Sequence, residues 1–140
     1  MIAIICFVAI SLIFSVLIPV VPSRAKGIAM VAGIVANSVL SGFVAVKVLM
    51  GQTFSFFFSG NLVSGPVTIA VDGLSAWFII MVSVVFVAGS FYAKEYLKSY
   101  RTTPAMLSLH YVAMVLLHTA IVGVLTVQNG FVVLIFWEIM

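Results

Sequence analysis

Charged side chains are scarce in this sequence. Asp, Glu, Lys and Arg together make up 6% of its 140 residues, whereas 65% of the residues are hydrophobic. Soluble domains are about a quarter charged, so a chain of this composition would not stay dissolved as a globular domain. Its 6 basic and 3 acidic residues also do not supply the densely basic surface that nucleic-acid binding requires. The composition therefore excludes a soluble domain, a disordered chain and a nucleic-acid-binding protein.

Residues that bind cofactors are equally sparse. Cys6 is the single cysteine, which rules out a disulfide framework and a cysteine-ligated metal site. The sequence contains no glycine-rich phosphate loop, no HExxH pattern and no CxxC pattern. We therefore expect no cofactor, no metal and no catalytic redox site in this chain. Any redox chemistry linked to it would take place in other subunits.

Long apolar runs are what the sequence does contain. A helix needs about 20 apolar residues to cross a hydrocarbon core of roughly 30 Å. Four runs without a charged residue meet this requirement: 2–21, 27–46, 73–93 and 105–127. A fifth run, 130–140, covers about half a span. The pattern predicts an all-α polytopic membrane protein with four full transmembrane helices and the start of a fifth. We expect 1–140 to be the N-terminal part of a longer subunit; a short re-entrant tail is the alternative.

The basic residues predict an orientation. Five of the six fall in the first and third loops: Arg24, Lys26, Lys94, Lys98 and Arg101. Because basic residues concentrate in cytoplasmic loops, we expect these two loops to be cytoplasmic and the N-terminus to lie outside. Lys47, at the outer end of the second helix, is the exception, and its stem can snorkel to the interface. The loop 51–72 mixes Phe, Ser and Gly; we interpret it as an outer interfacial segment, for which a short hairpin is one form.

Two polar residues favour structural roles. Asp72 directly precedes the third apolar run in the pattern DGLSAWF, where a carboxylate can cap a helix by accepting N–H bonds from its first turn. An ion-entry role at the outer surface is the alternative. Asn37 lies in a stripe of small residues on the second helix, near mid-membrane, where it can donate an interhelical hydrogen bond. A place in a polar pathway is the alternative for Asn37.

Glu138 favours a functional role, with a purely structural buried acid as the alternative. It lies eight residues beyond Gly130, which places it roughly 12 Å below the outer surface. A carboxylate at such depth faces a bundle interior, pairs with a base or lines a proton path. His118 lies at a similar depth on the preceding antiparallel helix, so it is a candidate partner that could relay protons. For His118 we favour a neutral histidine with a hydrogen bond inside the bundle, and the proton relay is the alternative.

Two segments resemble a known family. DGLSAWFIIMVSVVFVAGSFYAKEYL and NGFVVLIFWEIM are similar to the proton-conducting, antiporter-like membrane subunits of NADH–quinone oxidoreductase, hydrogenase-4, formate hydrogenlyase and multisubunit sodium/proton antiporters. The resemblance covers residues 72–140, and the acid in FWEIM is its most specific element. Members of this family are bundles built around two inverted repeats of about five helices each.

This resemblance implies a function. Glu138 matches the family's fifth-helix glutamate, which pairs with a lysine on a later helix and gates proton movement; such partners would lie beyond Met140. The chain would then translocate protons or another cation as a membrane subunit of a redox-driven complex, beside other membrane subunits in a bacterial or archaeal inner or plasma membrane. His118 matches no family motif.

Two other classes of protein remain as alternatives. One is a small four-helix transporter of the multidrug type, in which the membrane acid lies in the first helix. The other is a membrane scaffold without transport. Glu138 is the only candidate membrane acid here, and it lies at the opposite end of the chain from a first helix. Further spans with buried lysines after Met140 would distinguish the antiporter-like subunit from both.

Overall fold

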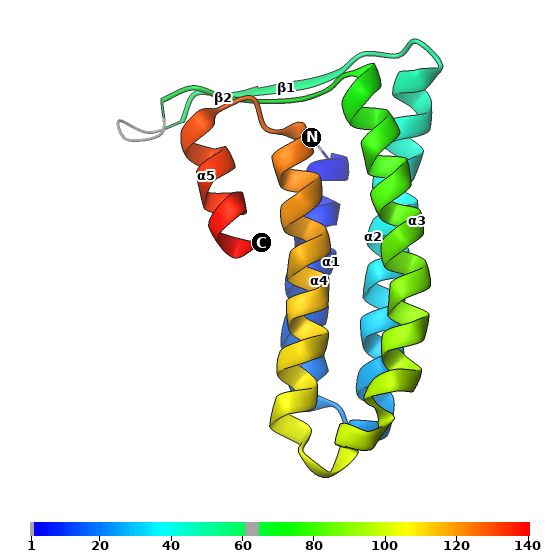
Figure 1. Ribbon diagram of the computed structural model, residues 1–140. Coiled ribbons are helices and arrows are strands. Elements are labelled where there is room, and N and C mark those ends of the chain that lie inside the picture. The colour runs from blue at the N-terminus through cyan, green and yellow to red at the C-terminus, as the bar shows by residue number, and fades with distance from the viewer. Residues whose placement is uncertain (1, 61–64) are drawn as a thin grey trace.

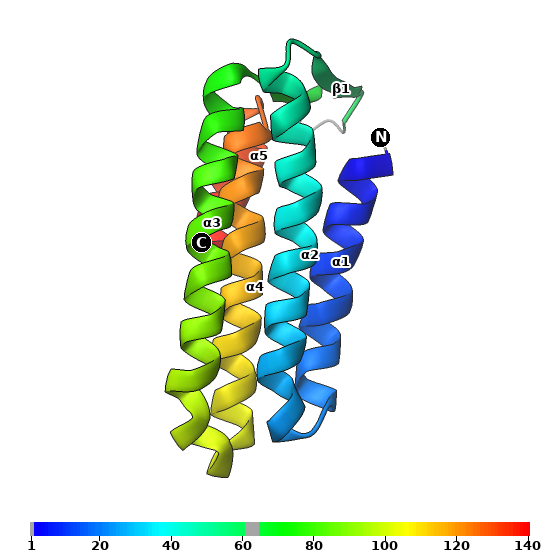
Figure 2. The same ribbon diagram turned by 90° about the vertical axis from the view of Figure 1, so that its right-hand side faces the viewer.

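Four long helices run side by side in an up-and-down bundle (Figure 1, Figure 2). The computed structural model describes residues 2–60 and 65–140. The long helices are α1 (Ile2–Val20), α2 (Ser23–Leu49), α3 (Gly73–Tyr96) and α4 (Pro104–Thr126). Each is long and apolar enough to cross a membrane. The architecture is therefore that of an all-α membrane protein with four spanning helices, as the apolar runs predict.

The second helix differs from the predicted one at both ends. It begins at Ser23, directly after Pro22, and it continues to Leu49, so it has 27 residues. Pro22 adopts φ −62°, which leads the chain straight into a helix without a connecting loop. The placement of Arg24 and Lys26 in a loop is therefore wrong: both lie in the first turns of α2.

A β-hairpin lies across one end of the bundle (Figure 1). Its strands are β1 (Phe54–Phe58) and β2 (Val67–Val71), paired antiparallel with Phe54 opposite Val71. They form the described part of the predicted outer loop, of which residues 61–64 lie outside the described residues. We call this side of the bundle the hairpin end. The opposite side is the basic end, formed by the α1–α2 connection at residues 21–22 and by the short 3-10 helix η1 (Leu97–Thr102).

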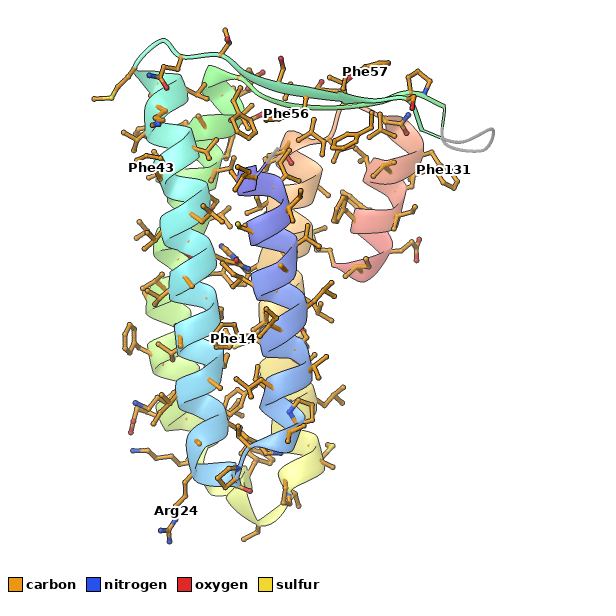
Figure 3. All side chains as sticks on the ribbon, turned by 180° about the vertical axis from the view of Figure 1, so that it is seen from behind. Phe14, Arg24, Phe43, Phe56, Phe57 and Phe131 are labelled. Carbon is orange, nitrogen blue, oxygen red and sulfur yellow. The ribbon has the colours of Figure 1, made fainter. Side chains whose placement is uncertain are left out.

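The bundle buries a narrow face of each helix. One core cluster lies toward the basic end and is formed by Ile18, Met30, Ile34, Leu97, Leu107, Tyr111 and Val115. A second lies under the hairpin and is formed by Ala45, Val71, Ala76 and Ile79. Large apolar side chains such as Phe43 and Phe131 point outward instead, and Arg24 projects from the basic end (Figure 3). Such an apolar exterior is what lipid as a solvent allows.

The fifth helix, α5 (Gly130–Ile139), is short and packs on α4. It starts under the hairpin and ends beside the middle of the bundle (Figure 1). Ten residues give it a length of about 15 Å. None of its residues is buried, so α5 depends on contacts at a few points rather than on a core of its own.

Candidate functional site

Asp72 caps α3 at the hairpin end. Its carboxylate accepts a hydrogen bond from the backbone N–H of Ser75 at 2.6 Å. This hydrogen bond holds the pKa of the exposed Asp72 carboxyl below its ordinary value. The geometry is that of the predicted helix cap, in which the side chain satisfies an N–H that the helix leaves without an internal partner.

Asn37 joins three helices in the middle of the bundle. It is 1% exposed, and its Nδ2 donates to the Ser11 hydroxyl of α1 at 2.7 Å. That hydroxyl is in turn 2.7 Å from the Thr119 hydroxyl of α4. The interhelical hydrogen bond expected for Asn37 is present: its partner is Ser11 of α1, and Ser11 in turn contacts Thr119 of α4. We refer to Ser11, Asn37, Ser38, His118 and Thr119 as the mid-bundle polar cluster.

His118 is buried in the same cluster. Its Nε2 lies 3.4 Å from the Ser38 hydroxyl of α2. The imidazole packs against the ring of Phe86, with the centroids 5.1 Å apart, and against the ring of Phe7 at 6.3 Å. Its Nδ1 has no hydrogen-bond partner among the described residues, and neither has Oδ1 of Asn37. The surroundings are those of a histidine held inside the bundle by one hydrogen bond and two aromatic rings.

The hydroxyls of this region also bond within their own helices. Ser11 donates to the Phe7 carbonyl at 2.9 Å, and Thr119 is 2.8 Å from the Val115 carbonyl. Ser41, one turn beyond Asn37, makes the same kind of bond back to the Asn37 carbonyl at 2.8 Å. The hydroxyls of Ser11, Ser41 and Thr119 therefore each have an acceptor four residues earlier in addition to any partner on another helix.

Glu138 stands apart from this cluster. Its side chain is exposed on α5, and no hydrogen bond or ion pair joins it to residues 2–60 or 65–140. The hypothesis that His118 is its local partner is not supported by the geometry. The reason is rotation about α4: α5 packs on Gly123, five residues and about 140° around the helix from His118. Equal depth in the membrane therefore does not bring the two side chains together.

Gly123 allows α5 to approach α4 closely. A Cβ atom added at Gly123 would lie 2.6 Å from Cδ1 of Phe136, well inside van der Waals contact. The Phe136 ring therefore rests directly on the α4 backbone. Since Phe136 is two residues before Glu138, this contact fixes which way the last turn of α5 faces.

Lys26 is a buried charge that the sequence did not indicate. It is 4% exposed, and its Nζ donates to the carbonyls of Pro19 at 3.4 Å and Pro104 at 3.2 Å. Its third partner is the Ser108 hydroxyl of α4. The ammonium therefore has three oxygen acceptors from α1 and α4, which satisfies its three donors without a carboxylate. Two basic residues next to a proline resemble a solvated loop, so no sequence signal marked this site.

An apolar cavity of about 230 Å³ lies under the hairpin. Its walls come from all five α-helices and both strands, and they include Phe7, Ser41, Ile69, Thr119 and Phe136. Thr119 is a member of the mid-bundle polar cluster, and Phe7 contacts its His118. The cavity therefore separates α5 from α1 and reaches the edge of that cluster from the hairpin end.

Comparisons with known proteins do not identify the chain. No protein-family model matches it, and no curated protein matches it either. Within the part of the chain that the structure describes, no group of three or more His, Cys, Asp or Glu side chains could hold a metal ion. The site therefore has to be interpreted from Glu138, Lys26 and the mid-bundle polar cluster themselves.

Proposed function

We propose that this chain belongs to an ion-translocating membrane subunit in which Glu138 carries the proton. The observation that supports the proposal is a carboxylate exposed on an apolar helix, about 12 Å along α5 from Gly130, with no partner among the described residues. Lys26 gives the contrast, because it is buried and fully hydrogen-bonded.

A carboxylate on an apolar membrane helix has few stable states. It is neutral, or it pairs with a base from a neighbouring element, or it lines an aqueous path. In a low-dielectric medium, a base that approaches or leaves such a carboxylate strongly changes how tightly the carboxylate holds its proton. Glu138 therefore has the chemistry of a gate whose proton is released by movement of a partner.

The distribution of basic residues supports one orientation. We infer that the basic end is cytoplasmic and that the hairpin end, with the N-terminus, lies outside. Lys47 is at the hairpin end, with its Nζ 4.4 Å from the centroid of the Phe43 ring, and its stem follows the lipid-facing surface. A bacterial or archaeal inner or plasma membrane is the compartment we propose.

The parent assembly is proposed from the resemblance of the two segments described above. The DGLS pattern falls on the cap and first turn of α3, and the FWEIM pattern falls on the end of α5 that carries Glu138. A membrane subunit of a redox-driven complex such as NADH–quinone oxidoreductase or hydrogenase-4 fits this placement. Electron transfer would belong to partner subunits, and this chain would contribute the proton-carrying acid.

The test is Glu138→Gln in the intact subunit, assembled and reconstituted in vesicles with a pH-sensitive dye inside. We expect proton uptake to fall by at least about a hundredfold, because general acid–base groups contribute factors of this size. Glu138→Asp, which keeps the ionisable group, should retain part of the uptake. Glu95→Gln is the matched control, since Glu95 is an exposed glutamate paired with Lys98 at the basic end. Uptake at the wild-type rate in correctly assembled Glu138→Gln would contradict the proposal, and would favour a scaffold.

A further inference from the structure

The hairpin is bonded to the residues that start α5. The backbone N–H of Gln128 donates to the Thr68 carbonyl of β2 at 2.9 Å, and Val127 forms an antiparallel bridge with Ile69. The α4–α5 connection therefore forms an isolated β-bridge with the edge of β2. This pairing ties the start of α5 to the outer loop.

Asn129 makes a second connection with the two ends of its amide. Its Oδ1 accepts from the backbone N–H of Val132 at 3.1 Å, which caps α5. Its Nδ2 donates to the carbonyl of Pro66, directly before β2, at 2.9 Å. One side chain thus both starts the helix and attaches it to the hairpin.

The other end of α5 is fixed by the Phe136 ring on Gly123. Two residues along an α-helix correspond to a rotation of about 200°. When Phe136 faces α4, Glu138 therefore faces away from α4, which agrees with its exposed side chain. Since α5 has no buried residue of its own, these two attachments set its direction.

We propose that the outer hairpin is a strap that positions Glu138, and that Asn129 is the positioning residue that transmits hairpin placement to α5. The effect of the strap on transport rests on the proposed function of Glu138. The positioning of α5 by the hairpin does not depend on that function. Movement of the hairpin at the outer surface would tilt α5 about the Gly123 contact. The carboxylate of Glu138 would then move relative to any base that faces it.

The test separates the two ends of the Asn129 amide. Asn129→Asp keeps an oxygen acceptor for the Val132 N–H but places an oxygen opposite the Pro66 carbonyl, where the amide donor was. Asp72→Asn is the matched control, because it exchanges the same two side chains at the cap of α3, whose side-chain bond goes to Ser75 within its own helix. Both variants are prepared in the intact subunit in vesicles.

Two quantities are measured: the rate at which an apolar carbodiimide modifies Glu138, and the pH profile of proton uptake. Loss of one hydrogen bond of about 1 kcal/mol corresponds to about a fivefold change in an equilibrium between two positions of α5. We expect Asn129→Asp to change the modification rate by about this factor and to shift the pH profile. Asp72→Asn should leave both unchanged. Equal rates and profiles in Asn129→Asp and the wild type would overturn the strap.

A cross-link provides the rescue. Val127 and Ile69 are bridge partners, so Ile69→Cys with Val127→Cys, in a Cys6→Ala background, can lock the hairpin to the α4–α5 connection. Oxidation should restore the wild-type modification rate in Asn129→Asp, and reduction should abolish the rescue. If the disulfide-locked Asn129→Asp variant keeps its altered rate of Glu138 modification, the result counts against the strap. Failure of the locked variant to assemble would also count against it. Because carbodiimide modification does not require transport, a transport-competent Glu138→Gln would refute the proposed function and leave this test intact.

Discussion

Lys26 and Glu138 are both ionisable residues on apolar helices, and the fold treats them in opposite ways. Lys26 is 4% exposed, and its ammonium is enclosed by oxygens of Pro19, Pro104 and Ser108. Glu138 is exposed on α5 and has no bonded partner within residues 2–60 and 65–140. The first charge ties the basic ends of α1, α2 and α4 together. The second contributes nothing to the packing that the structure describes.

The difference separates a structural charge, Lys26, from Glu138, the charge that we propose to be functional. Removing a buried charge whose donors are all used takes a partner from each of its acceptors, and this loss costs stability. A charge that no neighbour satisfies is retained for a different reason, and in membrane helices that reason is commonly ion movement. Stability and transport should therefore respond in opposite ways to changes at the two positions.

The largest effect on stability is expected from Lys26→Met. Removing the ammonium leaves the Pro19 carbonyl without this donor, whereas the Pro104 carbonyl keeps the Ser108 hydroxyl; we expect a cost of about 3 kcal/mol in the free energy of unfolding. Glu138→Gln should change the same free energy by less than about 0.5 kcal/mol. Unfolding by denaturing detergent in mixed micelles measures both. Similar changes in the free energy of unfolding for Lys26→Met and Glu138→Gln would contradict the distinction between a structural Lys26 and a Glu138 without a structural role.

A smaller effect is expected from Gly123→Ala, which alters how α5 presents Glu138. The new methyl group meets the Phe136 ring, so the ring and the last turn of α5 must move, at a cost of about 1–3 kcal/mol. Gly42→Ala is the matched control on α2, because nothing lies within 4 Å of the position its Cβ would take. The control should be neutral or stabilising by up to about 1 kcal/mol. Carbodiimide modification of Glu138 should change in Gly123→Ala and not in Gly42→Ala.

Thr119→Val tests whether the mid-bundle polar cluster belongs with Lys26 on the structural side. It removes the hydroxyl that meets Ser11 and should cost about 0.6 kcal/mol, the usual value for hydrogen bonds between membrane helices. Thr126→Val, whose hydroxyl bonds only to carbonyls of α4, should cost less. Unfolding midpoints in micelles compare the two. A larger loss in Thr126→Val would contradict the interhelical role of Thr119.

The smallest effect on stability is expected at Asp72, an exposed acid whose carboxylate accepts a hydrogen bond from the Ser75 N–H. The N–H of Ser75 lowers the Asp72 pKa below its ordinary value of 3.8 in the folded state. The cap therefore contributes its full stability above pH 3.8, and the contribution is lost as the pH falls through the lowered pKa of the folded state. In Asp72→Asn this part of the pH dependence should disappear. The unfolding midpoints of the wild type and of Asp72→Asn are measured as a function of pH, and their difference gives the contribution of the cap. If this difference does not change with pH, the capping hydrogen bond is not the source of the pH dependence.

Much of the fold follows from hydropathy alone. The four spans, the cap at Asp72 and the interhelical role of Asn37 could be predicted because length, capping chemistry and burial of amides follow general rules. The early start of α2 could not be predicted, because the charged residues Arg24 and Lys26 after a proline are typical of a loop. Only the fold brings the helix-end carbonyls of Pro19 and Pro104 to the ammonium.

The positions of His118 and Glu138 along their helices could be predicted, but the directions in which their side chains face could not. Counting residues along α4 and α5 gives the heights of His118 and Glu138, since the rise per residue is constant. Which way each side chain faces depends on the rotation of the helix, and the contact between Gly123 and Phe136 determines it. The partners Ser11 and Thr119 carried no signal either, because single hydroxyls in apolar runs are common.

The hydroxyls of the bundle have one more consequence, for its mobility. Ser11 and Thr119 each have a carbonyl of their own helix within reach, besides their contact across the interface. Breaking the interhelical contact therefore leaves each of the two hydroxyls bonded to a carbonyl of its own helix. Separating α1 from α4 at this point therefore costs the pair one contact and leaves neither hydroxyl unsatisfied.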